Sequence, residues 1–169
     1  MPRGPLRSPW GETRLLSEYL ALTYPEDLVF ERLRLGAAAP LMPSAEMTPA
    51  ELAMVGVFRR WADAVVVTPE DLIIVEAKVR SSPTAIGQLT LYQTLLASTP
   101  ELKPYLARRQ VLELVVAVED PAVSRLCASN GIRCRVYRPA WLPEYLAALG
   151  RRETRPPRDF EAGASETGL

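Results

Sequence analysis

Two short runs of apolar and β-branched residues, 63–67 and 72–76, are separated by the four-residue segment 68–71, which contains a proline. Runs of this length on either side of a turn predict a β-hairpin with a four-residue loop. If the two strands pair directly across this loop, Asp63 lies opposite Glu76. The segment therefore predicts an antiparallel strand pair that carries two facing carboxylates.

A lysine follows the second carboxylate at a spacing that places both side chains on one face. Successive residues of a strand point to opposite faces, so Glu76 and Lys78 point together and Ala77 points away. Lys78 is one of two lysines in a chain with 18 arginines, which suggests a position that needs a compact charge. Two facing acids repel each other. Because Mg²⁺ is commonly bound by one or two carboxylates, the group predicts a divalent-cation site.

This pattern resembles the PD-(D/E)xK nuclease superfamily. Asp63 corresponds to the first acidic motif and Glu76-Ala77-Lys78 to the E-x-K motif, over a resemblance of roughly residues 12–138. Ala62 stands where the superfamily name has proline.

Gln88 and Tyr92 resemble the Gln-x-x-x-Tyr motif of the RecB-type and Cas4-type branch. The four cysteines that hold an iron-sulfur cluster in some RecB-type relatives are missing, so no cluster is expected.

The resemblance implies a restriction-endonuclease-like α/β core and a metal-dependent nuclease that hydrolyses DNA. It implies that Mg²⁺ or Mn²⁺ is held by Asp63, Glu76 and the backbone carbonyl of Ala77. Lys78 would orient or deprotonate water, or stabilise charge on the phosphate. Since two adjacent carboxylates raise the pKa of a lysine, charge stabilisation is the preferred role.

Other residues are weaker candidates. Gln88 and Tyr92 would lie beside the active centre and position its groups or the DNA, or would be ordinary packing residues. Glu18 is a candidate additional acid on the first helix, or a solvated helix flank. Three arginines are candidate phosphate contacts, or simply surface charges: Arg59, Arg60 and Arg80.

Composition excludes several other function classes. The chain of 169 residues has no histidine and two cysteines, which removes histidine-based nuclease chemistry, histidine-dependent catalytic triads and most zinc sites. Its formal net charge is zero, so any DNA-binding surface must be local. No apolar stretch approaches the roughly 20 residues of a membrane span, and no secretory signal is evident, so a reduced, cytoplasmic protein without membrane contact is expected.

The chain divides into an arm at 1–11, a nuclease-like domain at 12–149 and a C-terminal tail at 150–169, which is expected to be disordered. The predicted order αβββαβαβα indicates an α/β fold with a mixed sheet. The first half of the chain is predicted to contain a helix at 12–24, a strand at 28–35, a loop at 36–49, a helical turn or strand approach at 50–57, and the hairpin to about 80. The second half is predicted to contain a helix ending near 97, a loop or short helix at 100–109, a strand at 111–118, a helix at 121–130, a strand at 132–137 and a helix at 141–149.

Two alternatives to a nuclease stay open. One is a non-catalytic DNA-binding or assembly component of a phage, transposon or defence complex, which uses the same fold. The other is a structural α/β domain in which Asp63 and Glu76 diverge. DNA is the expected partner, within a homodimer or a larger nucleic-acid-processing complex, and the sequence leaves DNA against RNA and endonuclease against exonuclease undecided.

Overall fold

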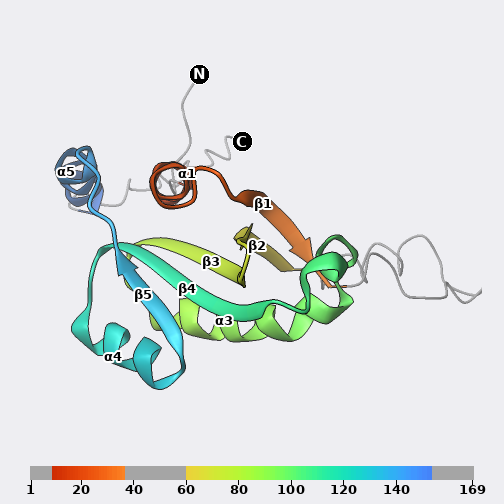
Figure 1. Cartoon of the computed structure of the whole chain (residues 1–169). Coiled ribbons are helices and arrows are strands. Elements are labelled where there is room, and N and C mark those ends of the chain that lie inside the picture. Colours follow the sequence, from red (N-terminus) through yellow and green to blue (C-terminus); the bar gives the residue numbers. More distant parts are fainter. Residues whose placement is uncertain (1–8, 37–59, 154–169) are drawn as a thin grey trace, which may run out of the picture. The chain divides into compact units, whose positions relative to one another are not determined.

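The computed structural model describes residues 9–36 and 60–153, and divides the chain into one unit that ends at Pro139 and a second that begins at Ala140. Figure 1 shows the elements along the chain. The first unit contains α1 (Pro9–Thr23), β1 (Leu28–Leu35), β2 (Arg60–Val67), β3 (Asp71–Arg80), α3 (Pro83–Leu95), two 3₁₀ helices (Leu96–Ser98 and Pro100–Tyr105), β4 (Arg109–Val118), α4 (Pro121–Ser129) and β5 (Ile132–Val136). The second unit contains α5 (Leu142–Glu153).

The five strands form one mixed sheet in the order β1-β2-β3-β4-β5. The pairs β1–β2 and β2–β3 are antiparallel, and the pairs β3–β4 and β4–β5 are parallel. Within residues 9–36 and 60–153, the predicted α/β class, the mixed sheet and the element order αβββαβαβα are confirmed. This is the arrangement expected for a restriction-endonuclease-like core.

The hairpin has the predicted register. Val67 pairs with Leu72, and the paired residues continue to Ala64 and Val75. The loop between the strands is closed by the Thr68 side chain, whose hydroxyl oxygen accepts the amide hydrogen of Asp71 at 2.9 Å. The turn therefore sets which residues face each other further along both strands.

The two strands separate beyond this ladder. The described β2–β3 pairing ends at Ala64 and Val75, whereas the β2 segment 60–62 continues to pair with β1. The second half of β3 remains paired with β4 as far as Arg80. A fork thus opens between β2 and β3 at Asp63 and Glu76.

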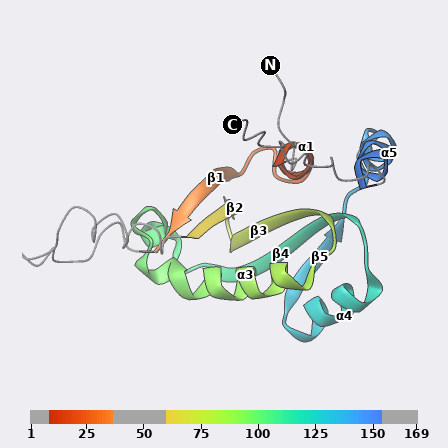
Figure 2. The same cartoon turned by 180° about the vertical axis from the view of Figure 1, so that it is seen from behind.

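Helices cover both faces of the sheet. Figures 1 and 2 show α1 on one face, and α3 and α4 on the other. The apolar side chains of α1 recur at helical spacing and are buried: Leu15, Leu16, Tyr19 and Leu20. On the opposite face, α3 buries Ala85 and Leu89 in a cluster with Leu72 and Ile74 of β3. The fork therefore lies at the edge of a two-sided core.

Helix ends agree with local sequence signals. Asp120 caps α4 by accepting the amide hydrogen of Ala122 at 2.8 Å, and Pro121 occupies the first turn. The predicted stop at 130–131 is confirmed, because Gly131 adopts φ +67°, which glycine tolerates best.

The largest differences from the predicted helix boundaries are at the start of α1 and the end of α5. α1 begins at Pro9 rather than Glu12, because proline is favoured in the first turn of a helix. α5 continues to Glu153, past the predicted end at 149, and the ring of its Tyr145 lies edge-on to the ring of Trp141, the residue before the helix, with centroids 5.6 Å apart. Predictions for residues 1–8, 37–59 and 154–169 lie outside the described residues. In the ranges that are described, no helix has both the length and the apolar character needed to cross a membrane.

Candidate active site at the β2–β3 fork

Asp63 bridges the two strands where their backbone pairing ends. Its Oδ2 accepts the amide hydrogen of Ala77 at 2.9 Å, and the residue is half-buried. The carboxylate therefore satisfies a β3 backbone donor that the diverging strand leaves without a ladder partner. The same bond holds Asp63 beside Glu76.

Glu76 is the most perturbed acid at the fork. It is 2% exposed, and its Oε1 lies 2.7 Å from the Lys78 Nζ, whereas its Oε2 is buried and has no hydrogen-bond partner. Burial, and next the charge of Asp63, raise the pKa of Glu76 to about 7, against the opposing effect of Lys78. A buried carboxylate oxygen without a donor is costly, so a cation beside it would stabilise the ionised form.

Lys78 lies between two carboxylates. Besides its 2.7 Å contact with Glu76, its Nζ is 3.7 Å from Oε2 of Glu12. Burial alone would lower the pKa of Lys78, but the hydrogen bond to Glu76 and the charges of Glu76, Glu12 and Asp63 outweigh burial and raise it. The group is therefore a fixed cation at neutral pH and a poor proton acceptor.

The first-helix acid at this cluster is Glu12, which sequence reasoning missed. Glu18, the candidate that was named instead, lies elsewhere: its carboxylate accepts hydrogen bonds from Arg14 at 2.8 Å and from the Tyr137 hydroxyl at 3.4 Å. Glu12 is in the first turn of α1, and burial raises its pKa while Lys78 opposes that rise. Glu12 was already within the predicted helix, and what the sequence did not show is the packing that brings it to Lys78.

Gln88 and Tyr92 lie close to the carboxylates. Tyr92 is 4% exposed on α3. Its pKa is raised by burial and then by the charges of Glu76 and Asp63, and a hydrogen bond with Gln88 opposes the rise. Tyr92 is therefore within electrostatic reach of the fork, and Gln88 contacts Tyr92; a role for the pair in positioning the site or the DNA stays a prediction.

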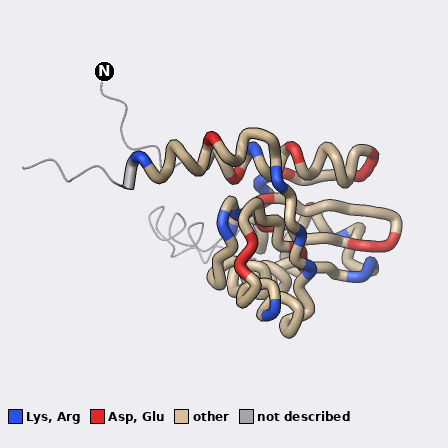
Figure 3. The backbone as a smooth tube through the Cα atoms, turned by 90° about the vertical axis from the view of Figure 1, so that its left-hand side faces the viewer, with Lys and Arg blue, Asp and Glu red and all other residues tan. Residues whose placement is uncertain are grey.

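The candidate arginines differ in position. Arg60 begins β2 and Arg80 ends β3, and both are exposed. Arg59 lies outside the described residues. Figure 3 shows basic and acidic segments interspersed along the described chain, which agrees with the zero net charge and with the absence of a long single-sign run there.

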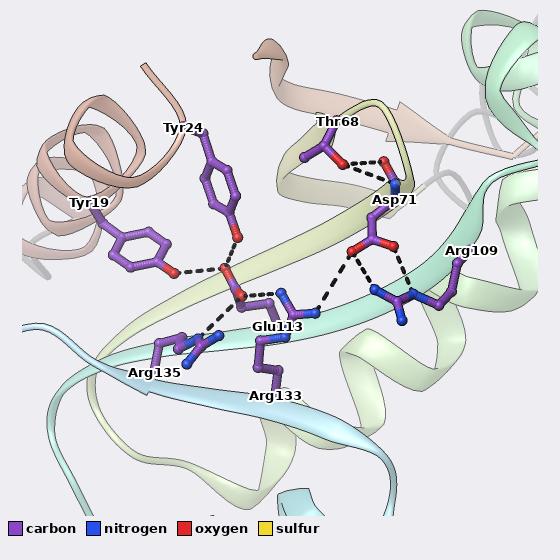
Figure 4. Close-up of polar contacts among 8 residues, drawn as sticks. All are labelled: Tyr19, Tyr24, Thr68, Asp71, Arg109, Glu113, Arg133 and Arg135. Atoms are coloured by element: carbon purple, nitrogen blue, oxygen red, sulfur yellow. Dashed lines mark hydrogen bonds and ion pairs between the residues drawn. The ribbon is translucent and has the colours of Figure 1, made fainter. Parts of the chain in front are cut away.

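A second buried carboxylate, Glu113, is fully partnered (Figure 4). Its Oε1 accepts the hydroxyl hydrogens of Tyr19 at 2.8 Å and Tyr24 at 2.9 Å, and its Oε2 lies 3.4 Å from Arg133 and 3.7 Å from Arg135. Burial, and then the charge of Glu113, raise the pKa of Tyr24 to about 12. Sequence reasoning missed this group within an apolar strand. It fastens α1, which carries Glu12, to β4.

The nearby Asp71 joins the same polar region. It receives two hydrogen bonds from Arg109, at 2.7 and 2.9 Å, and lies 3.9 Å from Arg133 (Figure 4). The hydrogen bonds from Arg109 hold the pKa of Asp71 below its usual range. Arg109 and Arg133 are therefore committed to carboxylates within the fold.

A cavity of about 260 Å³ opens next to Asp63. Residues of α1, β1 and β2 line it, among them Glu12, Arg32 and Trp61. Arg32 and Thr13 also line a neighbouring cavity of about 540 Å³. Asp63, on the β2 side of the fork, is thus accessible from the α1 side.

The donor set at the fork fits a small oxygen-coordinated cation. Among the described residues, no three or more Asp, Glu, His or Cys side chains lie close enough together to hold a metal ion. The fork offers a smaller set, namely Asp63, Glu76 and backbone oxygen. Mg²⁺ commonly keeps several waters and takes one or two carboxylates, and the unpartnered Oε2 of Glu76 suits that role.

Neither a family model nor a curated protein matches this sequence. Two similar solved structures are a repair endonuclease from Pyrococcus abyssi and a complex of EndoMS with double-stranded DNA. The first is 14% identical, with a TM-score of 0.47 over 81% of this chain and 50% of the other. The second is 13% identical, with a TM-score of 0.47 over 82% and 49%. This chain thus spans about half the length of each, and neither similarity identifies its functional residues.

Proposed function

We propose that this protein is a metal-dependent nuclease that hydrolyses phosphodiester bonds in DNA. The observation that carries the proposal is Glu76: a buried carboxylate with one oxygen unpartnered, held between Asp63 and Lys78 at the β2–β3 fork. A fold that needed only stability would pair or replace such a group. A divalent cation is the partner that its chemistry suits.

Asp63, Glu76 and the carbonyl of Ala77 would hold Mg²⁺ or Mn²⁺. When bound there, the ion supplies Lewis acidity and a more acidic water for attack on phosphorus. Asp63 can serve this site while it remains bonded to Ala77, because a carboxylate has acceptor positions on both oxygens.

Lys78 would stabilise the negative charge that develops on the phosphate oxygens. Its ammonium is kept protonated by Glu76 and Glu12, which agrees with electrostatic stabilisation and not with proton abstraction. Tyr92, hydrogen-bonded with Gln88, would help position the groups of the site or the DNA from the α3 side.

A cleavage assay tests the proposal. Linear, circular and branched DNA, with an RNA control, are incubated with wild type, Asp63→Asn, Glu76→Gln and Lys78→Ala in Mg²⁺, Mn²⁺ or chelator. The matched control is Glu101→Gln, an exposed acid outside the fork. We expect divalent-dependent DNA cleavage that the three fork variants lose and the control keeps.

Full cleavage by Asp63→Asn and Glu76→Gln would remove the fork from the reaction. Calorimetric binding of Mn²⁺ without cleavage of any substrate would instead favour the non-catalytic DNA-binding alternative. Calorimetry with Glu76→Gln shows whether the bound Mn²⁺ lies at the fork. If it does, the variant binds Mn²⁺ more weakly than wild type; if the ion binds elsewhere, the two affinities are equal.

A further inference from the structure

An exposed tryptophan lies beside the fork. Trp61 is 49% exposed and precedes Asp63 by two residues on β2, so both side chains point to the same face of that strand. Arg34, its partner across β1, has its guanidinium carbon 5.2 Å from the ring centroid, and that of Arg32 is at 5.8 Å. We call Arg32, Arg34 and Trp61 the Trp61 platform.

The platform and the fork share one cavity. Arg32, Trp61 and Asp63 all line the 260 Å³ space, so a group that contacts the ring has a continuous path to the carboxylate. Arg32 also lines the neighbouring 540 Å³ cavity together with Trp10, which is 74% exposed. The approach to the fork is therefore bordered by aromatic rings and guanidinium groups.

The backbone at Arg32 is unusual for a strand. Arg32 has φ +50°, yet the pairs on either side, Glu31 with Ala64 and Leu33 with Ala62, keep one unbroken register. No residue is inserted, so the left-handed conformation does not accommodate a bulge. Such conformations are uncommon in non-glycine residues, and strained ones cluster at functional sites. Here the site would be the cavity that Arg32 lines.

We infer that the Trp61 platform binds an unpaired strand of DNA and directs it into the fork, an inference that rests on the proposed nuclease function. A base can stack on an indole ring or a guanidinium plane only when its face is free, which excludes bases inside a duplex. The arginines supply the positive charge that a phosphate backbone requires. Glu12, Glu31 and Asp63 line the same cavity as Arg32, so the positive charge of the platform is local to Arg32 and Arg34.

Equilibrium binding in chelator tests the inference without cleavage. Fluorescence anisotropy of a labelled oligothymidine, and of a labelled duplex, is compared for wild type, Trp61→Leu and Trp61→Phe. Leu126→Ala on α4, 44% exposed, is the matched control for loss of an exposed apolar side chain. Loss of one stacked base should weaken single-strand binding about 5- to 150-fold in Trp61→Leu. Trp61→Phe, which keeps an aromatic face, should retain most of the affinity.

Each result decides the inference. Single-strand affinity that falls in Trp61→Leu but not in Leu126→Ala, with duplex affinity unchanged, supports it. Equal affinity of wild type and Trp61→Leu, or an equal loss for duplex, overturns it. Failure of the nuclease proposal is recognised separately, because wild type would then cleave no substrate in Mg²⁺ or Mn²⁺ whatever the anisotropy shows. Thermal unfolding of both Trp61 variants shows whether each is folded.

Discussion

Glu76→Gln is expected to stabilise the protein against unfolding in chelator, although it removes cleavage. Wild-type Glu76 has a pKa of about 7 because it is buried and lies near Asp63. In the unfolded chain the same group ionises near its ordinary value of 4.5. The native state therefore holds a proton more tightly, and its stability falls as the pH rises from about 4.5 to about 7, with little change above.

The size of this effect follows from the two pKa values. The difference between about 7 and 4.5 corresponds to about 3 kcal/mol, at about 1.4 kcal/mol per pH unit. At pH 8 the wild type carries the full cost, whereas at pH 5 it carries under about 1 kcal/mol. The pKa of about 7 already includes the favourable effect of Lys78, so about 3 kcal/mol is the upper bound at pH 8 for Glu76→Gln, which mimics the protonated acid.

Urea and thermal unfolding of both proteins at pH 5 and pH 8, in chelator, measure the effect. A chain of this size shifts its melting temperature by about 2–4 °C per kcal/mol, so the advantage of the variant should be readily measured at pH 8 and small at pH 5. Mn²⁺ should then raise the stability of wild type but not of the variant. Identical pH dependence in the two proteins would refute a charge cost at Glu76.

Four further outcomes are expected. Asp63→Ala should cost about 1–3 kcal/mol in urea unfolding, because the Ala77 amide loses its acceptor, and Asp63→Asn should cost less. Glu113→Ala should cost about 1–3 kcal/mol in the same assay, since it leaves the buried Tyr19 hydroxyl without its acceptor and the partly exposed Arg133 without its carboxylate. Lys78→Ala should lower single-turnover DNA cleavage about 10²- to 10³-fold with circular dichroism unchanged. Arg32→Gly should weaken single-strand binding in anisotropy while stability stays within about 1 kcal/mol of wild type, because relief of the positive φ offsets glycine's entropy.

The hairpin and its acids were predictable because they depend on local sequence. The loop 68–71 fixes the register, and with it the side-by-side placement of Asp63 and Glu76. The proximity of Lys78 to Glu76 follows from the alternation of side chains along one strand. Short sequence separations and a strict period of two are sufficient to place these groups.

The first-helix acid was not predictable at the same level. Glu12 and Glu18 are six residues apart on one helix, so the choice between them depends on where the helix begins and how it lies on β3. The helix begins at Pro9, which places Glu12 in a helical turn where it reaches Lys78. Helix boundaries follow from tertiary packing as well as from local signals.

The contacts of Glu113 with Tyr19, Tyr24 and Arg133 could not be predicted from the sequence either. Its partners Tyr19, Tyr24 and Arg133 are 94, 89 and 20 residues away in the sequence. A lone glutamate within an apolar run such as 111–118 can lie on an exposed edge of the sheet, or it can be buried and held by hydrogen bonds and ion pairs. Only the parallel pairing of β4 with β5, which sets Glu113 beside Arg133, decides between them.

Glu76 and Glu113 are both buried acids, but they differ in how many partners their carboxylate oxygens have. Glu113 has two hydroxyl donors on one oxygen and two guanidinium groups near the other, so its charge is compensated within the chain. Glu76 has one ammonium on one oxygen and nothing on the other. Removal of the charge should therefore destabilise the protein at Glu113 and stabilise it at Glu76 in chelator. Opposite signs for Glu113→Gln and Glu76→Gln at pH 8 would identify Glu113 as a structural acid and Glu76 as an acid whose missing partner comes from outside the chain.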